Sequence, residues 1–69
     1  MTSARNYWTD AELREDAAYW RRRAIGHQLR ARSEWDGSRQ LRYVNECLQR
    51  AEASERILRA RQDFERARP

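Results

Sequence analysis

The chain is short of the residues that reinforce small proteins. It has one cysteine, one histidine, one proline and two glycines among 69 residues. A single Cys47 excludes an internal disulfide, and one cysteine with one histidine cannot complete a zinc site within one chain. There is no Gly-rich phosphate loop and no set of nucleophile, base and orienting group. The sequence therefore predicts a protein that is not an enzyme and needs no cofactor, metal or small-molecule substrate.

Long apolar runs are also missing. No segment approaches the roughly 18 apolar residues of a membrane span, and the N-terminus lacks the apolar core of a secretory signal. We therefore expect a cytoplasmic protein with no membrane partner. A chain of this length buries only about 60% of its unfolded surface and is marginal as a monomer. Association with a second molecule is the reinforcement that remains.

Lysine is absent, so all fifteen basic residues are arginine, against eleven acids and a net charge of +4. We attribute this to the GC-rich genome of a bacterium or a phage. Every cation is then a planar fork suited to carboxylate, phosphate and aromatic faces. The charge is uneven, because residues 21–42 carry seven arginines and two acids. Positive charge is expected to gather around the middle of the chain.

A first helix is predicted over about 10–34. Thr9 with Glu12 forms a capping box, and Trp8 can pack on Leu13 as a hydrophobic staple, so residues 1–8 are expected to be a flexible arm. A narrow stripe of residues then recurs every three or four positions and predicts a helix seam. Its members are Leu13, Ala17, Trp20, Ala24, His27, Ala31 and Trp35. Ala18, Ile25 and Leu29 form a weaker second strip, and Gly26 is a place where the helix could kink.

A bend is predicted at about 35–38. Gly37 can adopt the left-handed conformation that ends a helix, and Ser38 can cap the next one. Alternatively, Ser33 with Asp36 would start the second helix earlier; we favour the later break. The second helix, about 39–67, then has a seam of Leu41, Val44, Leu48, Ala51 and Leu58, interrupted by Glu55, and a separate strip of Ile57 and Phe64.

These patterns predict an all-α fold, an antiparallel two-helix hairpin in one domain over residues 9–69. Packing one stripe of each helix together leaves the strips Ala18/Ile25/Leu29 and Ile57/Phe64 uncovered. A two-fold dimer that forms a four-helix bundle would cover them. His27 and Cys47 lie at comparable distances from the bend, so two copies could offer a two-His, two-Cys metal site. We favour a seam histidine and a small buried thiol instead.

The function favoured by the sequence is a protein-interaction module, encoded by a phage or mobile element, that binds and modulates a host or structural protein. Exposed aromatic and apolar residues are the side chains that most often anchor protein interfaces. The candidates are Tyr7, Trp8, Trp35, Tyr43, Ile57 and Phe64. The alternative is an accessory protein that binds nucleic acid through arginine contacts to phosphates. Its candidates are Arg14, Arg21, Arg32, Arg39 and Arg42.

The bend also carries Trp35, Asp36 and Gly37. This Trp-x-Gly resembles the turn of the WXG family of leaderless secreted helical hairpins. The chain is shorter than members of that family usually are, and it is basic. It lacks near its C-terminus a tyrosine followed four residues later by an acid, the export signal associated with that family. The resemblance implies a secreted hairpin as a minor alternative.

Overall fold

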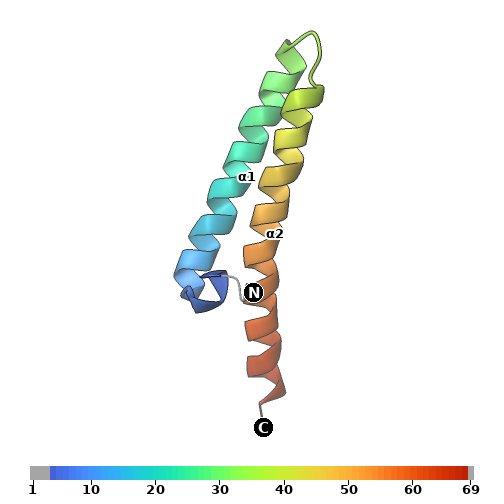
Figure 1. Cartoon of the computed structure of the whole chain (residues 1–69). Coiled ribbons are helices and arrows are strands. Elements are labelled where there is room, and N and C mark those ends of the chain that lie inside the picture. Colours follow the sequence, from blue (N-terminus) through green and yellow to red (C-terminus); the bar gives the residue numbers. More distant parts are fainter. Residues whose placement is uncertain (1–3, 69) are drawn as a thin grey trace.

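The computed structural model describes residues 4–68, which form an antiparallel hairpin of two long helices (Figure 1). A short 3₁₀ helix η1 (Ala4–Tyr7) leads into α1 (Asp10–Ser33), and the bend 34–37 connects it to α2 (Ser38–Ala67). No strand occurs in this part of the chain. The two helices pack against each other along their length. The prediction of an all-α helical hairpin is confirmed, and the helix ends lie within one residue of those expected.

Local chemistry starts α1 as the sequence predicts. The Glu12 backbone N–H donates to Thr9 Oγ1 at 3.1 Å, and the Thr9 backbone N–H donates to Glu12 Oε1 at 3.0 Å. These bonds satisfy two of the backbone donors that a helix start leaves free. The hydrogen bond from the Thr9 backbone lowers the pKa of Glu12 below its ordinary value. The capping box is therefore confirmed.

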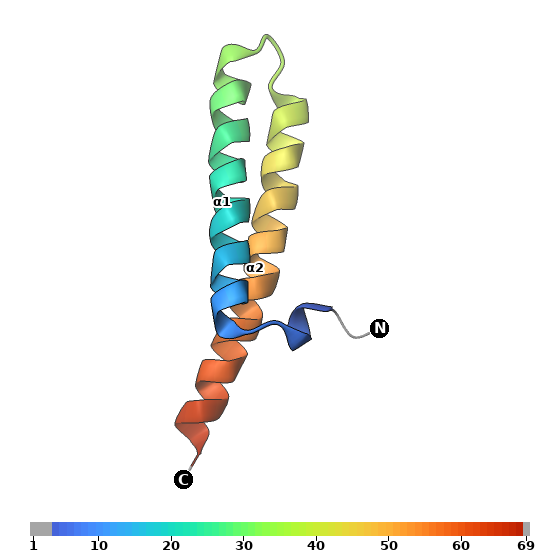
Figure 2. The ribbon, with the colours of Figure 1, turned by 90° about the vertical axis from the view of Figure 1, so that its left-hand side faces the viewer.

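The segment before α1 was expected to be a flexible arm, of which residues 1–3 lie outside the described part. Residues 4–7 form η1, and this turn contacts α2. Arg5 Nε donates to Ser54 Oγ of α2 at 3.1 Å and lies 3.5 Å from Asp16 Oδ2 of α1. Figure 2 shows the turn lying across the hairpin beside α2. A side chain of the expected arm thus bridges both helices.

The bend forms by a different route from the one predicted. Gly37 has φ −84°, so it is not left-handed, and Ser38 is the first residue of α2 and not its cap. Asp36 Oδ1 instead accepts the Ser38 backbone N–H at 3.0 Å. Glycine is needed for space, because a Cβ at position 37 would lie 2.9 Å from the Ala31 carbonyl oxygen. The earlier break is excluded, since Ser33 still lies in α1 and donates to the Arg30 carbonyl.

The core is a thin seam of small side chains. It contains Leu13, Ala17 and Ala24 of α1 with Val44, Cys47, Ala51 and Ser54 of α2. Trp20 and Leu48 are half-buried against it. Small residues let two helices approach closely, but they bury little apolar area. The hairpin therefore has a narrow core, as expected for a chain of this size.

Two residues predicted for the seam lie outside it. Trp35 is fully exposed, because α1 ends at Ser33 and the residues that follow leave the helical stripe. Leu41 is 51% exposed, while Cys47 and Ser54 are buried in the α2 seam. The buried stripe of α2 is therefore rotated towards Cys47 and Ser54 relative to the predicted one. Gly26 causes no break, since α1 is continuous through it.

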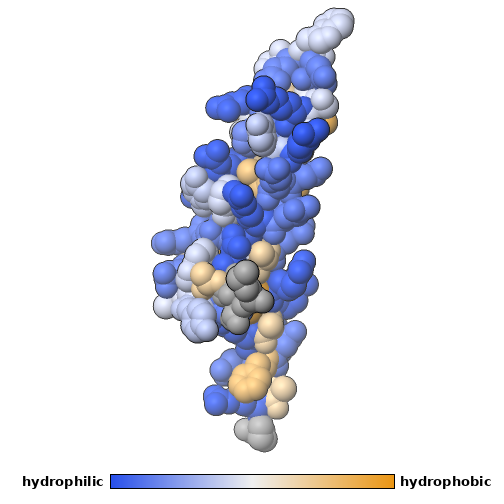
Figure 3. All heavy atoms as spheres, viewed as in Figure 1, coloured by the Kyte–Doolittle hydropathy of each residue, from blue (hydrophilic) through white to orange (hydrophobic). Residues whose placement is uncertain are grey.

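The two helices differ in length, and α2 extends past the start of α1 (Figures 1 and 2). Arg61 of α2 pairs with Asp10, the first residue of α1. The last turns of α2 therefore have no α1 beside them, and Phe64 there is 65% exposed. Figure 3 shows apolar side chains gathering at this end, on a face that is elsewhere mostly hydrophilic. Across residues 4–68, neither helix is apolar enough over sufficient length to cross a membrane.

Candidate interaction surfaces

The predicted partner-binding residues separate into two groups at opposite ends of the hairpin. Trp35 lies in the bend, and Tyr43 lies in the second turn of α2 beside it. The other group is at the far end, where Tyr7 and Trp8 lie by η1 and Ile57 and Phe64 lie on the C-terminal half of α2. The molecule therefore offers two candidate surfaces, here named the bend surface and the far-end surface.

The bend is held by a chain of polar contacts. His27 Nδ1 lies 2.7 Å from Gln40 Oε1, and Gln40 Nε2 donates to Glu34 Oε1 at 3.1 Å. Because Nδ1 faces an amide oxygen, this network assigns the ring proton to Nδ1. The His27 ring also lies against Tyr43, with 5.2 Å between the centroids. These contacts connect α1, the bend and α2, so the loop that carries Trp35 is fixed on both sides.

The bend surface combines an exposed indole with positive charge. Trp35 has 101% of its reference area exposed, which is the largest value among the exposed large apolar residues of the described chain. The two nearby carboxylates are engaged, Glu34 by Gln40 and Asp36 by the Ser38 backbone, which lowers the pKa of Asp36.

Three predicted arginines, Arg32, Arg39 and Arg42, lie exposed around this bend. Within residues 4–68, none of them is within ion-pair distance of a carboxylate. The bend surface therefore carries unneutralised guanidinium groups next to an aromatic side chain. Guanidinium groups recognise carboxylates, phosphates and aromatic faces.

One of the candidate phosphate-binding arginines of α1 is neutralised by a carboxylate of α2. Arg21 forms a bidentate pair with Glu55 of α2, with Nε to Oε2 at 2.8 Å and the second nitrogen to Oε1 at 2.6 Å. This pair raises the pKa of Arg21 and lowers that of Glu55. Arg21, one of the candidate phosphate contacts, is therefore already occupied by a carboxylate from a residue 34 positions away. Arg14 and Arg32, the other two candidates on α1, are exposed.

The far end contains a buried polar network that the sequence analysis missed. Ser54 is fully buried, donates to Asp16 Oδ2 at 2.6 Å and accepts from Arg5 Nε. Asp16 Oδ1 accepts from Trp20 Nε1 at 3.0 Å. The signal for Ser54 was its spacing, since it follows Ala51 by three residues on the seam. The network joins η1 to both helices and fixes the position of the far-end surface.

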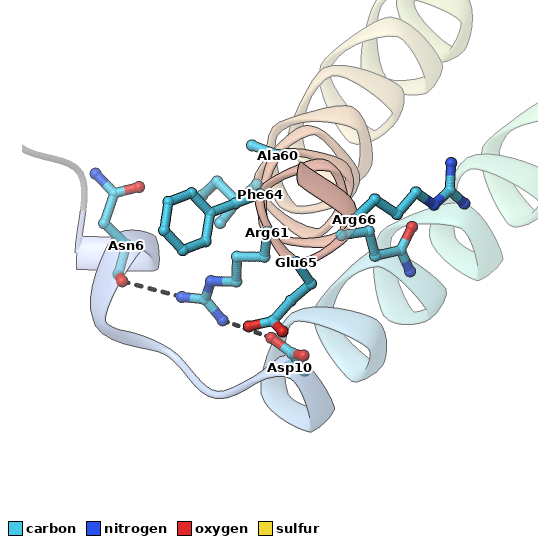
Figure 4. Close-up of a pocket in the computed structure, with 9 residues that line it drawn as sticks. Asn6, Asp10, Ala60, Arg61, Phe64, Glu65 and Arg66 are labelled. Carbon is cyan, nitrogen blue, oxygen red and sulfur yellow. Dashed lines mark hydrogen bonds and ion pairs between the residues drawn. The ribbon is translucent and has the colours of Figure 1, made fainter. Parts of the chain in front are cut away.

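An open groove lies between η1 and the C-terminal half of α2 (Figure 4). Arg61 spans it, donating to Asp10 Oδ1 at 2.7 Å and to the Asn6 carbonyl at 3.0 Å. Ile57 and Phe64 supply its apolar part. Figure 4 shows Phe64 and Arg61 projecting from α2 towards the turn that carries Asn6. The arrangement is an apolar strip with a polar wall, a shape that suits another helix.

His27 and Cys47 do not form part of a metal-binding group in the hairpin. Within the described residues, no three His, Cys, Asp or Glu side chains lie close enough together to hold an ion. Cys47 is buried in the core beside Ala24 and Val44, and His27 is half-buried against Gln40. Cys47 therefore packs in the core, and His27 contributes to the contacts that hold the bend.

Comparison of the chain with protein-family models, with curated proteins and with solved structures found no match.

Proposed function

We propose that this chain is a small, non-catalytic helical module of the cytoplasm that binds and modulates a host or structural protein through its bend surface. The observation that supports this most is the fully exposed Trp35 on a bend fixed by hydrogen bonds. Tryptophan is among the side chains most enriched at binding hot spots. A loop that is already ordered also loses less conformational entropy when it binds.

The side chains of the bend surface indicate which kind of protein surface would bind there. Trp35 requires an apolar pocket, and the exposed Arg32, Arg39 and Arg42 favour acidic groups around it. Guanidinium groups at the edge of an interface contribute mostly to association rate and specificity, whereas a buried indole contributes to affinity. We therefore expect a partner with an apolar pocket bordered by Asp and Glu.

A paired substitution tests this proposal. Trp35→Ala removes the exposed indole without touching the core, and Tyr7→Ala removes a comparably exposed ring, 81% exposed, at the other end. Tagged wild-type protein should retain a stoichiometric partner from host lysate after nuclease treatment. Tyr7→Ala should retain the same partner, and Trp35→Ala should lose it. Retention by Trp35→Ala would contradict binding through the bend.

Binding of nucleic acid is the second candidate, supported by the arginines of the bend that lack carboxylate partners in the described chain. Arg39 and Arg42 with Arg32 and Arg14 could contact phosphates, whereas Arg21 is occupied by Glu55. Replacing Arg32, Arg39 and Arg42 with glutamine should lower the log–log salt dependence of affinity by about 2–3 units if each contacts a phosphate. An unchanged anisotropy of labelled DNA and RNA at low salt would exclude this function.

Self-association is part of the proposal. The core is narrow, and apolar side chains such as Ile25, Leu29 and Phe64 remain more than half exposed. A homodimer would cover part of that area, and a four-helix bundle is one arrangement.

The minor alternative is a WXG-like secreted hairpin, since Trp35 and Gly37 do lie at the turn between two helices. Its test is appearance in the culture medium without a cytoplasmic marker.

A further inference from the structure

The C-terminal half of α2 carries a second seam on the face turned away from α1. Its residues are 4, 3, 4 and 3 positions apart, which is the spacing of a coiled-coil contact. They are Ala53, Ile57, Ala60, Phe64 and Ala67. The first two are half-buried, and the other three are exposed. The position that precedes Ala53 in this spacing is Arg50. Its guanidinium stacks over the Trp20 ring of α1, 4.5 Å from the ring centroid, so the apolar seam begins at Ala53.

Large and small residues alternate along this second seam, and the alternation is self-complementary. A coiled-coil seam alternates between two positions, a and d, and in an antiparallel pair each a position faces a d position of the other helix. Here the large residues occupy one of these positions and the alanines occupy the other. Placing Ile57 opposite Ala60 of a second copy also places Phe64 opposite Ala53 of that copy. The two-fold axis repeats both contacts. Every large side chain then meets an alanine, so the two helices can approach closely.

The charged residues beside the second seam fit the same register. Arg56 and Asp63 lie on one edge, are exposed and form no ion pair within the described chain. In the antiparallel register Arg56 faces Asp63 of the second copy, and the pair occurs twice. On the opposite edge, Ser54 and Arg61 are already bonded to Asp16 and Asp10 of α1. The free charges are therefore on the edge where a second copy complements them.

One second copy cannot cover both exposed strips of the hairpin. Ile25 follows Arg21 by one turn, so it lies on the flank where Arg21 pairs with Glu55. Ile57 follows Ser54 by three residues, so it lies on the opposite flank. Beside the α2 strip, Arg56 and Asp63 are charges that a second copy would complement.

We propose that two copies of this chain pair antiparallel through the second seam of α2, with Ile57 against Ala60 of the second copy. The two bend surfaces then lie at opposite ends of an extended rod. The assembly presents two Trp35 side chains that face away from each other, so it can bridge two partner molecules. This bivalence rests on the proposed function of the bend, whereas the pairing itself does not.

Sedimentation equilibrium over a range of concentrations tests the pairing, with charge exchange as the probe. Asp63→Arg sets like charges opposite each other twice and should weaken the dimer about tenfold, as should Arg56→Asp. The double variant Arg56→Asp/Asp63→Arg restores both pairs and should return to within about threefold of wild type. A wild type that stays monomeric throughout, or a double variant as weak as the single ones, would overturn the pairing.

A distance measurement tests the antiparallel direction. A spin label at Arg39→Cys, with Cys47→Ala to remove the native thiol, should give a distance between copies of about 60 Å. A parallel pair would bring the labels within about 20 Å and overturn the register. A monomeric protein whose partner is still lost on Trp35→Ala would refute the pairing and leave the proposed function intact. A dimer whose partner binding ignores Trp35 would do the reverse.

Discussion

Replacing Ser54 with alanine tests whether the buried polar network holds the far end of the hairpin together. Ser54 Oγ is fully buried and bonds both Asp16 and Arg5. A hydrogen bond to a charged group contributes about 1.5–3 kcal/mol. Alanine has a higher helix propensity than serine, which returns about 0.5 kcal/mol. The net loss in the free energy of unfolding should therefore be about 1–2.5 kcal/mol.

In a chain of this length, such a loss lowers Tm by roughly 5–15 °C. Urea unfolding followed by circular dichroism measures the loss in the free energy of unfolding. All variants are compared at one fixed protein concentration, because self-association shifts apparent stability. Ser33→Ala is the matched control, since Ser33 is exposed and should change stability by less than about 0.5 kcal/mol. In an Asp16→Ala background the Ser54→Ala effect should shrink. Equal effects of Ser54→Ala and Ser33→Ala would refute the network's role.

Four further substitutions test the two glycines and the cap of α1. Gly26→Ala should stabilise the protein by about 0.5–1 kcal/mol, because a Cβ there meets no atom within 4 Å and α1 gains helix propensity. Gly37→Ala should destabilise it, since the new Cβ would lie 2.9 Å from the Ala31 carbonyl oxygen; equal Tm values for the two variants would contradict this pair of predictions. Thr9→Ala should cost about 1 kcal/mol in urea unfolding by removing the cap, and no change in midpoint would argue against it. The lowered pKa of Glu12 means that its contribution is present at neutral pH and is lost as pH falls through its folded-state pKa, below the ordinary glutamate value of about 4.3. Glu12→Gln keeps the hydrogen bond without the titration, so its Tm should fall less on acidification than that of wild type.

The sequence by itself determined the features that depend on neighbours along the chain. The Thr9 and Glu12 capping box fixes the start of α1, because both partners lie within one turn. Helical periodicity likewise determined two helices with one bend between them. The conformation of Gly37 was predicted wrongly, since the requirement there is space beside Ala31 and not a left-handed backbone.

Only the tertiary structure decided what each face meets. Helical periodicity predicts a stripe of residues on one face, but the packing of the two helices selects which edge of that stripe is buried. In α2, Ser54 is buried and Leu41 is exposed. Arg21 of α1 forms an ion pair with Glu55 of α2, which no pattern within one helix could predict. Trp35 became fully exposed because the helix ended two residues before it. The burial of Ser54 and the Arg21–Glu55 pair depend on contacts between residues far apart in the chain, which no pattern of neighbouring residues contains.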